Sequence, residues 1–221
     1  MNGERVSLRE RRKRETRQEI SDTATSLFLE RGFDAVTIAQ VAEAAGVAKM
    51  TVTNHFARKE DLVLDLHEEL IAGPTRVVTD RGPGESPLAA LRAWFLAAVE
   101  RRDPAAGFCG QAFARMLVAS PALVARMREI HDGREASLAD ALAAESRAAA
   151  RDVIPRVVAA QLSGIHRVLF TEVFHRVLTG DPADQIAVSL ADVTRAAFDQ
   201  LTPSLGDYGV RPAGYVLTGD V

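Results

Sequence analysis

Several residue types are scarce in this chain of 221 residues, and each scarcity narrows what the protein can be. A single cysteine, Cys109, excludes an intrachain disulfide and leaves too few thiols for a structural zinc site, so the fold rests on packing in a reducing compartment. No stretch approaches the roughly 18 continuous apolar residues of a membrane span, and the charged first residues are not followed by the apolar core of a signal peptide. We therefore expect a cytoplasmic protein with no membrane partner.

The net charge of −3 argues against a nucleic-acid partner until its distribution along the chain is considered. Up to Asp61 the chain carries eleven basic and ten acidic residues, and beyond it sixteen and twenty. Seven of the eleven basic residues in the first 61 positions precede Gln18: Arg5, Arg9, Arg11, Arg12, Lys13, Arg14 and Arg17. A solvated, partly disordered tail has the same composition, so this basic cluster gains meaning only from the motif that follows it.

Helical spacing of the apolar residues predicts an all-α protein without strands. The expected helices cover residues 7–31, 38–45, 48–55, 87–102, 108–119, 121–151, 153–179 and 183–201, with one more opening at residues 58–61 and placing Leu62, Leu66 and Leu70 inward. From Thr202 on, proline, glycine and aspartate recur without apolar periodicity. We expect an N-terminal arm and three-helix DNA-binding head in residues 1–61, a larger helical domain in 62–202 and a loose tail in 203–221.

Residues 37–56 have the spacing of a helix-turn-helix. Thr37 is a good N-cap for the first of the two helices, because its hydroxyl can accept from amides near Gln40. Ala42 is small where the second helix crosses closely, Gly46 can adopt the left-handed conformation of the turn, and Val52 faces the core. An ordinary helical hairpin in an alanine-rich chain has the same pattern, so the surrounding sequence decides between them.

That surrounding sequence resembles the tetracycline-repressor (TetR) family. The matching segments are LFLERGFDAVTI at 27–38, AAGV at 44–47, TVTNHF at 51–56 and KEDL at 59–62, within a region from about 14 to 66. The resemblance implies an all-helical homodimer, usually a repressor, in which a ligand-binding and dimerisation domain controls the spacing of two heads on a near-palindromic double-stranded operator. It implies no cofactor and no catalytic role.

Carried onto this sequence, the resemblance assigns DNA-contacting residues. The expected set is Arg14, Thr37, Lys49, Met50, Thr51, Thr53, Asn54, His55 and Lys59. Lys49 can donate to a guanine edge or a phosphate, Asn54 can pair with adenine, and Met50 can touch a thymine methyl group. Thr37, His55 and Lys59 correspond to the family's phosphate anchors, which fix register rather than sequence. The cluster from Arg9 to Arg17 is expected to follow the phosphates or to enter a minor groove as an arm.

Three positions depart from the family pattern. Ala48 stands where a capping serine or threonine is usual, which costs the recognition helix about 1 kcal/mol. Met50 replaces a common glycine, and Thr53 replaces a common tyrosine that touches the DNA backbone. The operator sequence therefore cannot be inferred from relatives.

The larger domain offers candidates for an effector pocket and for a dimer seam. A small lipophilic effector is expected among Trp94, Phe95, Phe108, Gln111, Phe113, Met116, Met127 and His131, although most helical apolar residues are plain core. Two apolar stripes are expected to form a four-helix dimer seam or, with the same pattern, a buried intrachain pair. They comprise Ile154, Val157, Val158, Ile165 and Leu169, and Ile186, Leu190, Val193, Ala197 and Phe198.

The sequence supports a catalytic or metal site less well than a DNA-binding site. His166 and His175 are nine residues apart and point to opposite faces of one helix, while His131 and Glu135 share a face but lack a third ligand. Cys109 is more readily a buried inert thiol than a redox sensor or a link across a dimer. Two alternatives stay open: an enzyme with a vestigial helix-turn-helix, and a helical sensor or scaffold that does not bind DNA.

Overall fold

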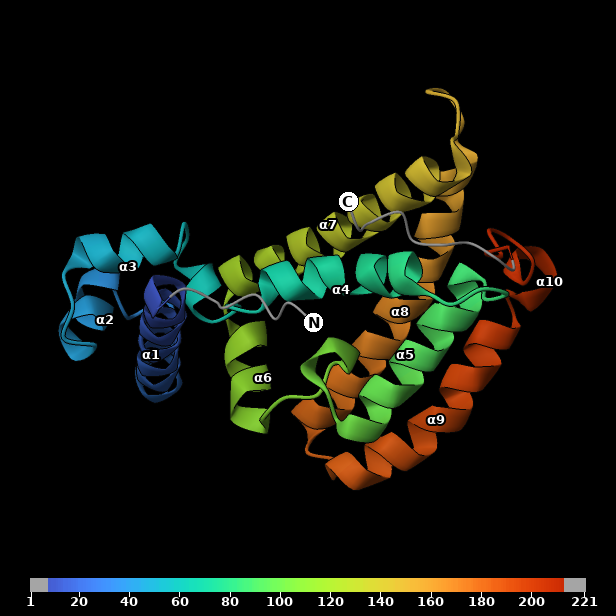
Figure 1. Ribbon diagram of the computed structural model, residues 1–221. Coiled ribbons are helices and arrows are strands. Elements are labelled where there is room, and N and C mark those ends of the chain that lie inside the picture. The colour runs from blue at the N-terminus through green and yellow to red at the C-terminus, as the bar shows by residue number, and fades with distance from the viewer. Residues whose placement is uncertain (1–7, 213–221) are drawn as a thin grey trace. The chain divides into compact units, whose positions relative to one another are not determined.

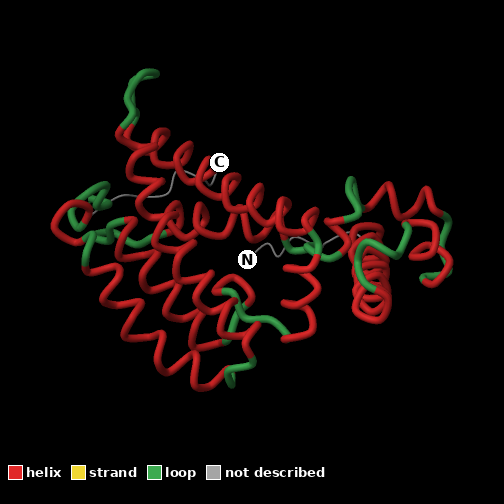
Figure 2. Tube along the Cα trace, turned by 180° about the vertical axis from the view of Figure 1, so that it is seen from behind, coloured by secondary structure: helices red, strands yellow, loops and turns green. Residues whose placement is uncertain are grey.

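The protein is all-helical over the residues that the structure, a computed structural model, describes, namely 8–212. Contacts divide these residues into two units: a head, with residues 8–67 and 115–126, and a body, with residues 68–114 and 127–212. Figure 2 shows helices and loops but no strand along this part of the chain. The predicted all-α fold is confirmed. No helix within 8–212 is long and apolar enough to cross a membrane.

The head is built from α1 (Leu8–Arg31), α2 (Ile38–Ala44) and α3 (Lys49–His55). Ile20, Ala24 and Phe28 lie four residues apart on α1 and are at most 1% exposed, so one stripe of this helix forms the floor of the head. Val41 from α2 and Val52 from α3 complete the core and are both fully buried. The long helix α1 and the two short helices α2 and α3 are therefore held together by a single apolar core.

The body encloses the larger core. It contains α5 (Pro87–Arg101), α8 (Ile154–Thr179) and α9 (Ala183–Asp199), which pack against one another (Figure 1). Helices α4 (His67–Asp80), α6 (Gln111–Ala119), α7 (Pro121–Ser146) and α10 (Thr202–Leu205) complete the described chain, with 3₁₀ turns at Glu60–Leu62 and Pro104–Ala106. Phe95 and Phe198 are its largest buried side chains, with 0% and 2% exposure. Ser86 caps α5 and accepts from the amide of Ala89 at 3.3 Å.

The expected helix opening at residues 58–61 is wrong. Glu60–Leu62 forms a 3₁₀ turn, and α4 begins only at His67. Leu62, Val63 and Leu64 are all buried, at 0%, 5% and 7% exposure. Consecutive residues of a continuous helix point about 100° apart, so three in a row cannot all face one core, and the chain turns instead.

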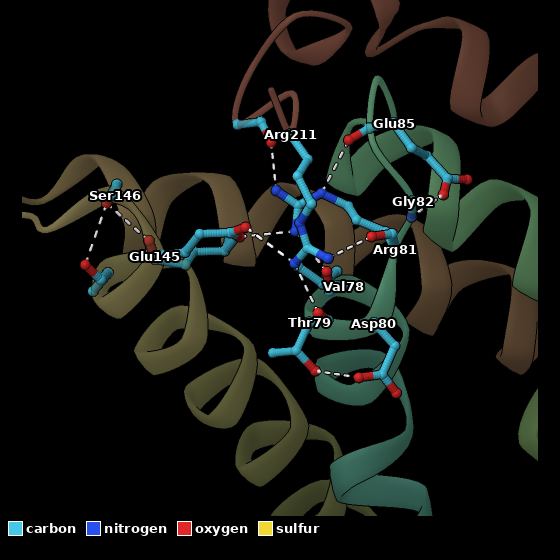
Figure 3. Close-up of polar contacts among 12 residues, drawn as sticks. Val78, Thr79, Asp80, Arg81, Gly82, Glu85, Glu145, Ser146 and Arg211 are labelled. Carbon is cyan, nitrogen blue, oxygen red and sulfur yellow. Dashed lines mark hydrogen bonds and ion pairs between the residues drawn. The ribbon is translucent and has the colours of Figure 1, made fainter. Parts of the chain in front are cut away.

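The tail was expected to be loose from residue 203, and this is wrong as far as residue 212. Arg211 is 5% exposed, and its Nη2 donates to the carbonyl of Thr79 at 2.7 Å and lies 3.3 Å from Oε1 of Glu145. Arg81 reaches the other oxygen of the same carboxylate at 2.8 Å, so two arginines share Glu145 (Figure 3). Because these contacts join residues more than 60 positions apart, local sequence patterns do not reveal them. Residues 213–221 lie outside the described part.

Candidate nucleic-acid interface

The turn between α2 and α3 fixes the orientation of α3. Thr37 forms the predicted cap as a full capping box: its Oγ1 accepts from the amide of Gln40 at 3.3 Å, and its own amide donates to Oε1 of Gln40 at 2.8 Å. Gly46 has a φ of 65°, as the turn requires. Ala48 has N-cap backbone angles but provides no side-chain hydrogen bond. The N-terminus of α3 therefore has fewer hydrogen-bonded amides than the N-terminus of α2.

The exposed side of α3 carries the predicted base-reading residues. Lys49, Met50, Thr53 and Asn54 are exposed, Met50 by 69%, and Thr51 is half-buried. Thr53 uses its hydroxyl within the helix, donating to the carbonyl of Met50 at 3.1 Å. The helix is thus anchored in the head by a buried apolar residue and presents other side chains to solvent. A helix that reads bases in the major groove needs this arrangement.

His55 and Lys59 are more restrained than free phosphate anchors. Burial lowers the pKa of His55, and Lys13 and Arg17 lower it further, so the ring is largely neutral at pH 7. Lys59 donates from Nζ to the carbonyl of Phe33 at 2.6 Å and lies 4.3 Å from the centre of that ring. Burial lowers the pKa of Lys59, yet an ammonium has three donors, so others stay available to a phosphate.

The basic cluster lies on α1. The chain is helical from Leu8, so residues 9–17 belong to α1, as the expected helix over residues 7–31 implies; Arg5 falls outside the described residues. Arg14 is exposed. Arg17 instead turns inward, donates to the carbonyls of His55 and Asp65, and lies 4.2 Å above the ring of Phe56. Arg17 thus satisfies the C-terminal end of α3, a role that the charge pattern did not indicate.

Residues 115–126 belong to the head although they are distant from it in sequence. Ser120 donates from Oγ to Oδ1 of Asp34 at 3.0 Å. Arg126 places Nε and Nη2 each 2.9 Å from Oδ1 of Asp61, whose side chain is 5% exposed. A buried ion pair thus ties the beginning of α7 to the 3₁₀ turn that follows the helix-turn-helix.

The predicted pocket residues are dispersed. Phe95 and Phe108 are buried core, Met116 falls in the head, and Trp94, Gln111, Phe113, Met127 and His131 are half-buried. A cavity of about 10 Å³ does lie in the body, but none of these eight residues lines it. Its polar lining comes from Arg134, Ser163 and His166. Sequence analysis missed Arg134, although its position four residues from both Ile130 and Leu138 places a charge in an apolar stripe.

The two stripes predicted for a dimer seam are divided between core and surface. Val158, Leu169, Ile186, Leu190 and Phe198 are buried within the body, and Ile165 and Ala197 pack against its core. Ile154, Val157 and Val193 remain exposed by 52%, 46% and 50%, together with Val168 at 67% and Val188 at 78%. Part of the pattern therefore reflects intrachain packing, and part leaves apolar surface on α8 and α9.

Cys109 packs against the body core and is half-buried. Burial raises the pKa of its thiol to about 11. The thiolate is the reactive form, so this cysteine is a weak nucleophile at neutral pH, as the sequence analysis favoured.

Comparison with known proteins agrees with this geometry. Residues 20–66 match the family described as bacterial regulatory proteins of the tetR family, and residues 85–206 match the MftR C-terminal domain. The regulator TcmR of Streptomyces glaucescens is 31% identical over 204 residues, which are 90% of this chain and 88% of TcmR. The repressor AcnR of Corynebacterium glutamicum is 36% identical over 67 residues, which are 30% of this chain and 36% of AcnR. A crystal structure of NalD from Pseudomonas aeruginosa shares the fold, with a TM-score of 0.51, 22% identity, and coverage of 84% of this chain and 97% of NalD.

Proposed function

This chain belongs to the TetR family of DNA-binding transcriptional regulators, and on that premise we propose that it is a repressor which a small effector releases from its operator. The observation that supports DNA reading most strongly is the surface of α3. Lys49 and Asn54 are exposed on it, while Val52 locks the same helix into the head core. Lysine and asparagine can distinguish guanine and adenine in the major groove.

We propose that Thr37, His55 and Lys59 contact phosphates at either side of this helix, with Arg14 adding a charge on α1. At neutral pH, His55 acts as a neutral hydrogen-bond donor rather than as a charge, because its pKa is lowered. Lys59 reaches a phosphate while it keeps the carbonyl of Phe33. These contacts set the register in which Lys49 and Asn54 read the bases.

The proposed repressor acts as a homodimer through α8 and α9. The exposed side chains of Val168, Val188 and Val193 provide apolar surface, and a groove of about 720 Å³ along the two helices is bordered by Val168, Val193 and the polar residues Glu172 and His175. Two heads are needed because successive major grooves on one face of DNA lie about 34 Å apart. A near-palindromic operator follows from this symmetry.

The proposed DNA binding is tested by a gel-shift titration of the full-length protein against the intergenic DNA upstream of its own gene, at low salt. We expect a retarded complex whose affinity falls steeply as salt increases, since Lys and Arg contacts release counterions from the phosphates. The double variant Lys49→Ala, Asn54→Ala should lose sequence preference, and Arg101→Gln, an exposed change in the body, should not. Equal affinity of the double variant and the wild type would remove α3 as the reader.

A helical sensor that does not bind DNA predicts the opposite outcome. Such a protein would show no retarded complex at low salt, or a weak complex with a flat salt dependence. Sedimentation at micromolar concentration adds the second test, since the proposal requires a dimer. A monomer there would contradict the α8 and α9 interface.

A further inference from the structure

Arg134 is a buried cation held between two helices of the body. It lies on α7 and is 2% exposed. Its Nε donates to the carbonyl of Leu70 at 2.8 Å. That carbonyl needs an outside donor because Pro74, four residues further along α4, has no N–H to offer it. Arg134 therefore takes the place of a missing helical hydrogen bond, and this fixes its guanidinium.

The second partner of Arg134 is a neutral ring. Nη1 of Arg134 donates to Nδ1 of His166 at 2.7 Å, and burial holds the pKa of His166 well below its usual value. Nearby His131 is also neutral at pH 7, since burial and the charges of Arg134 and Arg167 lower its pKa to about 4 against the opposing effect of Asp132. The ring accepts a hydrogen bond but brings no negative charge to Arg134.

Within residues 8–212, no carboxylate pairs with Arg134. The other buried arginines of the body differ, because Arg81 and Arg211 both pair with Glu145. Burial lowers the pKa of Arg134 to about 10, so the side chain still carries its charge at neutral pH. Burying a charge without a counterion costs free energy, and buried charges in proteins are therefore usually paired with an opposite charge.

A cavity adjoins this charge and has one further unsatisfied polar group. Its volume is about 10 Å³, roughly the space of one water molecule, and Arg134, Ser163 and His166 are among the residues that line it. Ser163 is 9% exposed and its Oγ has no hydrogen-bond partner. Leu91 and Phe198 are among its apolar walls. The side chains of Arg134 and Ser163 thus lie beside a small space whose surface is apolar.

We propose that this cavity is the subsite for the acidic group of the effector, and that the effector is a small organic acid with an apolar body. Its carboxylate pairs with the guanidinium of Arg134 and accepts from the hydroxyl of Ser163. The half-buried ring of Trp94 stacks on His166, with centroids 5.5 Å apart. The proposal requires this ring to move when the apolar body binds, because the cavity itself has room for about one water molecule. The assignment rests on the proposed effector-controlled function and adds the chemistry of the effector to it.

The first test compares acids with their neutral amides in the absence of DNA. Decanoate and 2-naphthoate are titrated into the full-length protein by calorimetry, each beside its primary amide. The binding of decanoate is also followed by the fluorescence of Trp94, the only tryptophan of the chain. We expect each acid to bind about 10 to 100 times more tightly than its amide, the range of a hydrogen-bonded charge pair. Equal affinities for both pairs, or no binding of either acid, would overturn the proposal.

The contribution of Arg134 is tested with a matched control. Arg134→Gln should abolish the preference for the acids, whereas Arg101→Gln, at an exposed position of the same unit, should keep it. A preference that survives Arg134→Gln would assign the acid to another site. Thermal unfolding of both variants shows whether each is folded.

A pair of variants at Ser163 keeps the proposal testable if Arg134→Gln does not fold. Ser163→Asp supplies the missing carboxylate from within the chain, and Ser163→Asn is its neutral match in size. We expect Ser163→Asp to melt about 3 °C higher than Ser163→Asn and to bind neither acid, because the subsite is then filled. An aspartate variant that is no more stable than the asparagine variant, or that binds decanoate like the wild type, would show that Arg134 has no need of an anion.

The outcomes for the subsite and for the proposed repressor are distinguishable. The acid titrations contain no DNA, and the gel-shift titration of the unliganded protein contains no acid. If the protein retards DNA but binds acids and amides equally well, only the proposed subsite is contradicted. If it prefers acids but does not retard DNA, the subsite stands and the proposed repressor function is contradicted.

Discussion

The N-terminus of α3 allows helix capping to be tested at the base-reading helix itself. Ala48 already has N-cap angles, φ −69° and ψ 145°, and it is exposed, so a serine there needs neither backbone movement nor burial of its hydroxyl. The head contains its own template, since Thr37 has similar angles of −98° and 158° and caps α2. We expect Ala48→Ser to stabilise the head by about 1 kcal/mol and Thr37→Ala to destabilise it by about the same amount.

Hydrogen exchange of the α3 amides is the direct assay, because a change of about 1 kcal/mol alters the opening equilibrium about fivefold. The melting temperature should shift by only about 2–4 °C in a chain of this size. Ala57→Ser is the matched control, an exposed alanine just beyond the end of α3. If Ala48→Ser slows exchange in α3 no more than Ala57→Ser does, the missing cap does not limit this helix.

Three further predictions concern stability. Gly46→Ala should cost about 1 kcal/mol in urea unfolding, because a Cβ at Gly46 meets open space and only its φ of 65° is unfavourable; Gly107→Ala should cost several times more, since its Cβ would lie 2.6 Å from a backbone oxygen of α8. His131 has a pKa near 4 when folded and 6.5 when unfolded, so the unfolded chain binds the extra proton. The stability present above pH 6.5 should therefore fall as the pH drops toward 4, by up to about 3 kcal/mol, and His131→Gln should flatten that profile. Arg126→Gln should cost about 3–5 kcal/mol in the same unfolding assay because it leaves the carboxylate of Asp61 buried without its guanidinium, and adding Asp61→Asn should restore part of the loss.

The sequence predicted those parts of the head whose signals are local. A cap and the residue it serves lie three positions apart at Thr37 and Gln40, and the turn at Gly46 depends on the conformation of one residue. The start of α4 could not be predicted in this way. Its position depends on how much of Leu62, Val63 and Leu64 the rest of the fold covers, and burial on that scale is a tertiary property.

Arg134 and Arg211 illustrate the second limit. Each lies in a sequence context that a surface arginine also occupies, and each acquires its role from a partner more than 60 positions away: the carbonyl of Leu70 for the first and Glu145 for the second. The sequence signal for Arg134 is weak: a charged residue lies between two buried apolar residues of one helical stripe. For Arg211 the composition of the tail contains no such signal.

Helix α7 carries two arginines whose roles depend on distant parts of the chain, Arg126 and Arg134. Arg126 binds Asp61 within the head, and Arg134 lies beside the cavity of the body. An acid at Arg134 changes DNA affinity only if it binds the DNA-competent and the released states with different strength. The same factor must then appear in reverse, so operator DNA should weaken decanoate binding by the factor with which decanoate weakens DNA binding. Unequal factors would mean that the acid acts on the DNA complex by some route other than binding to this protein.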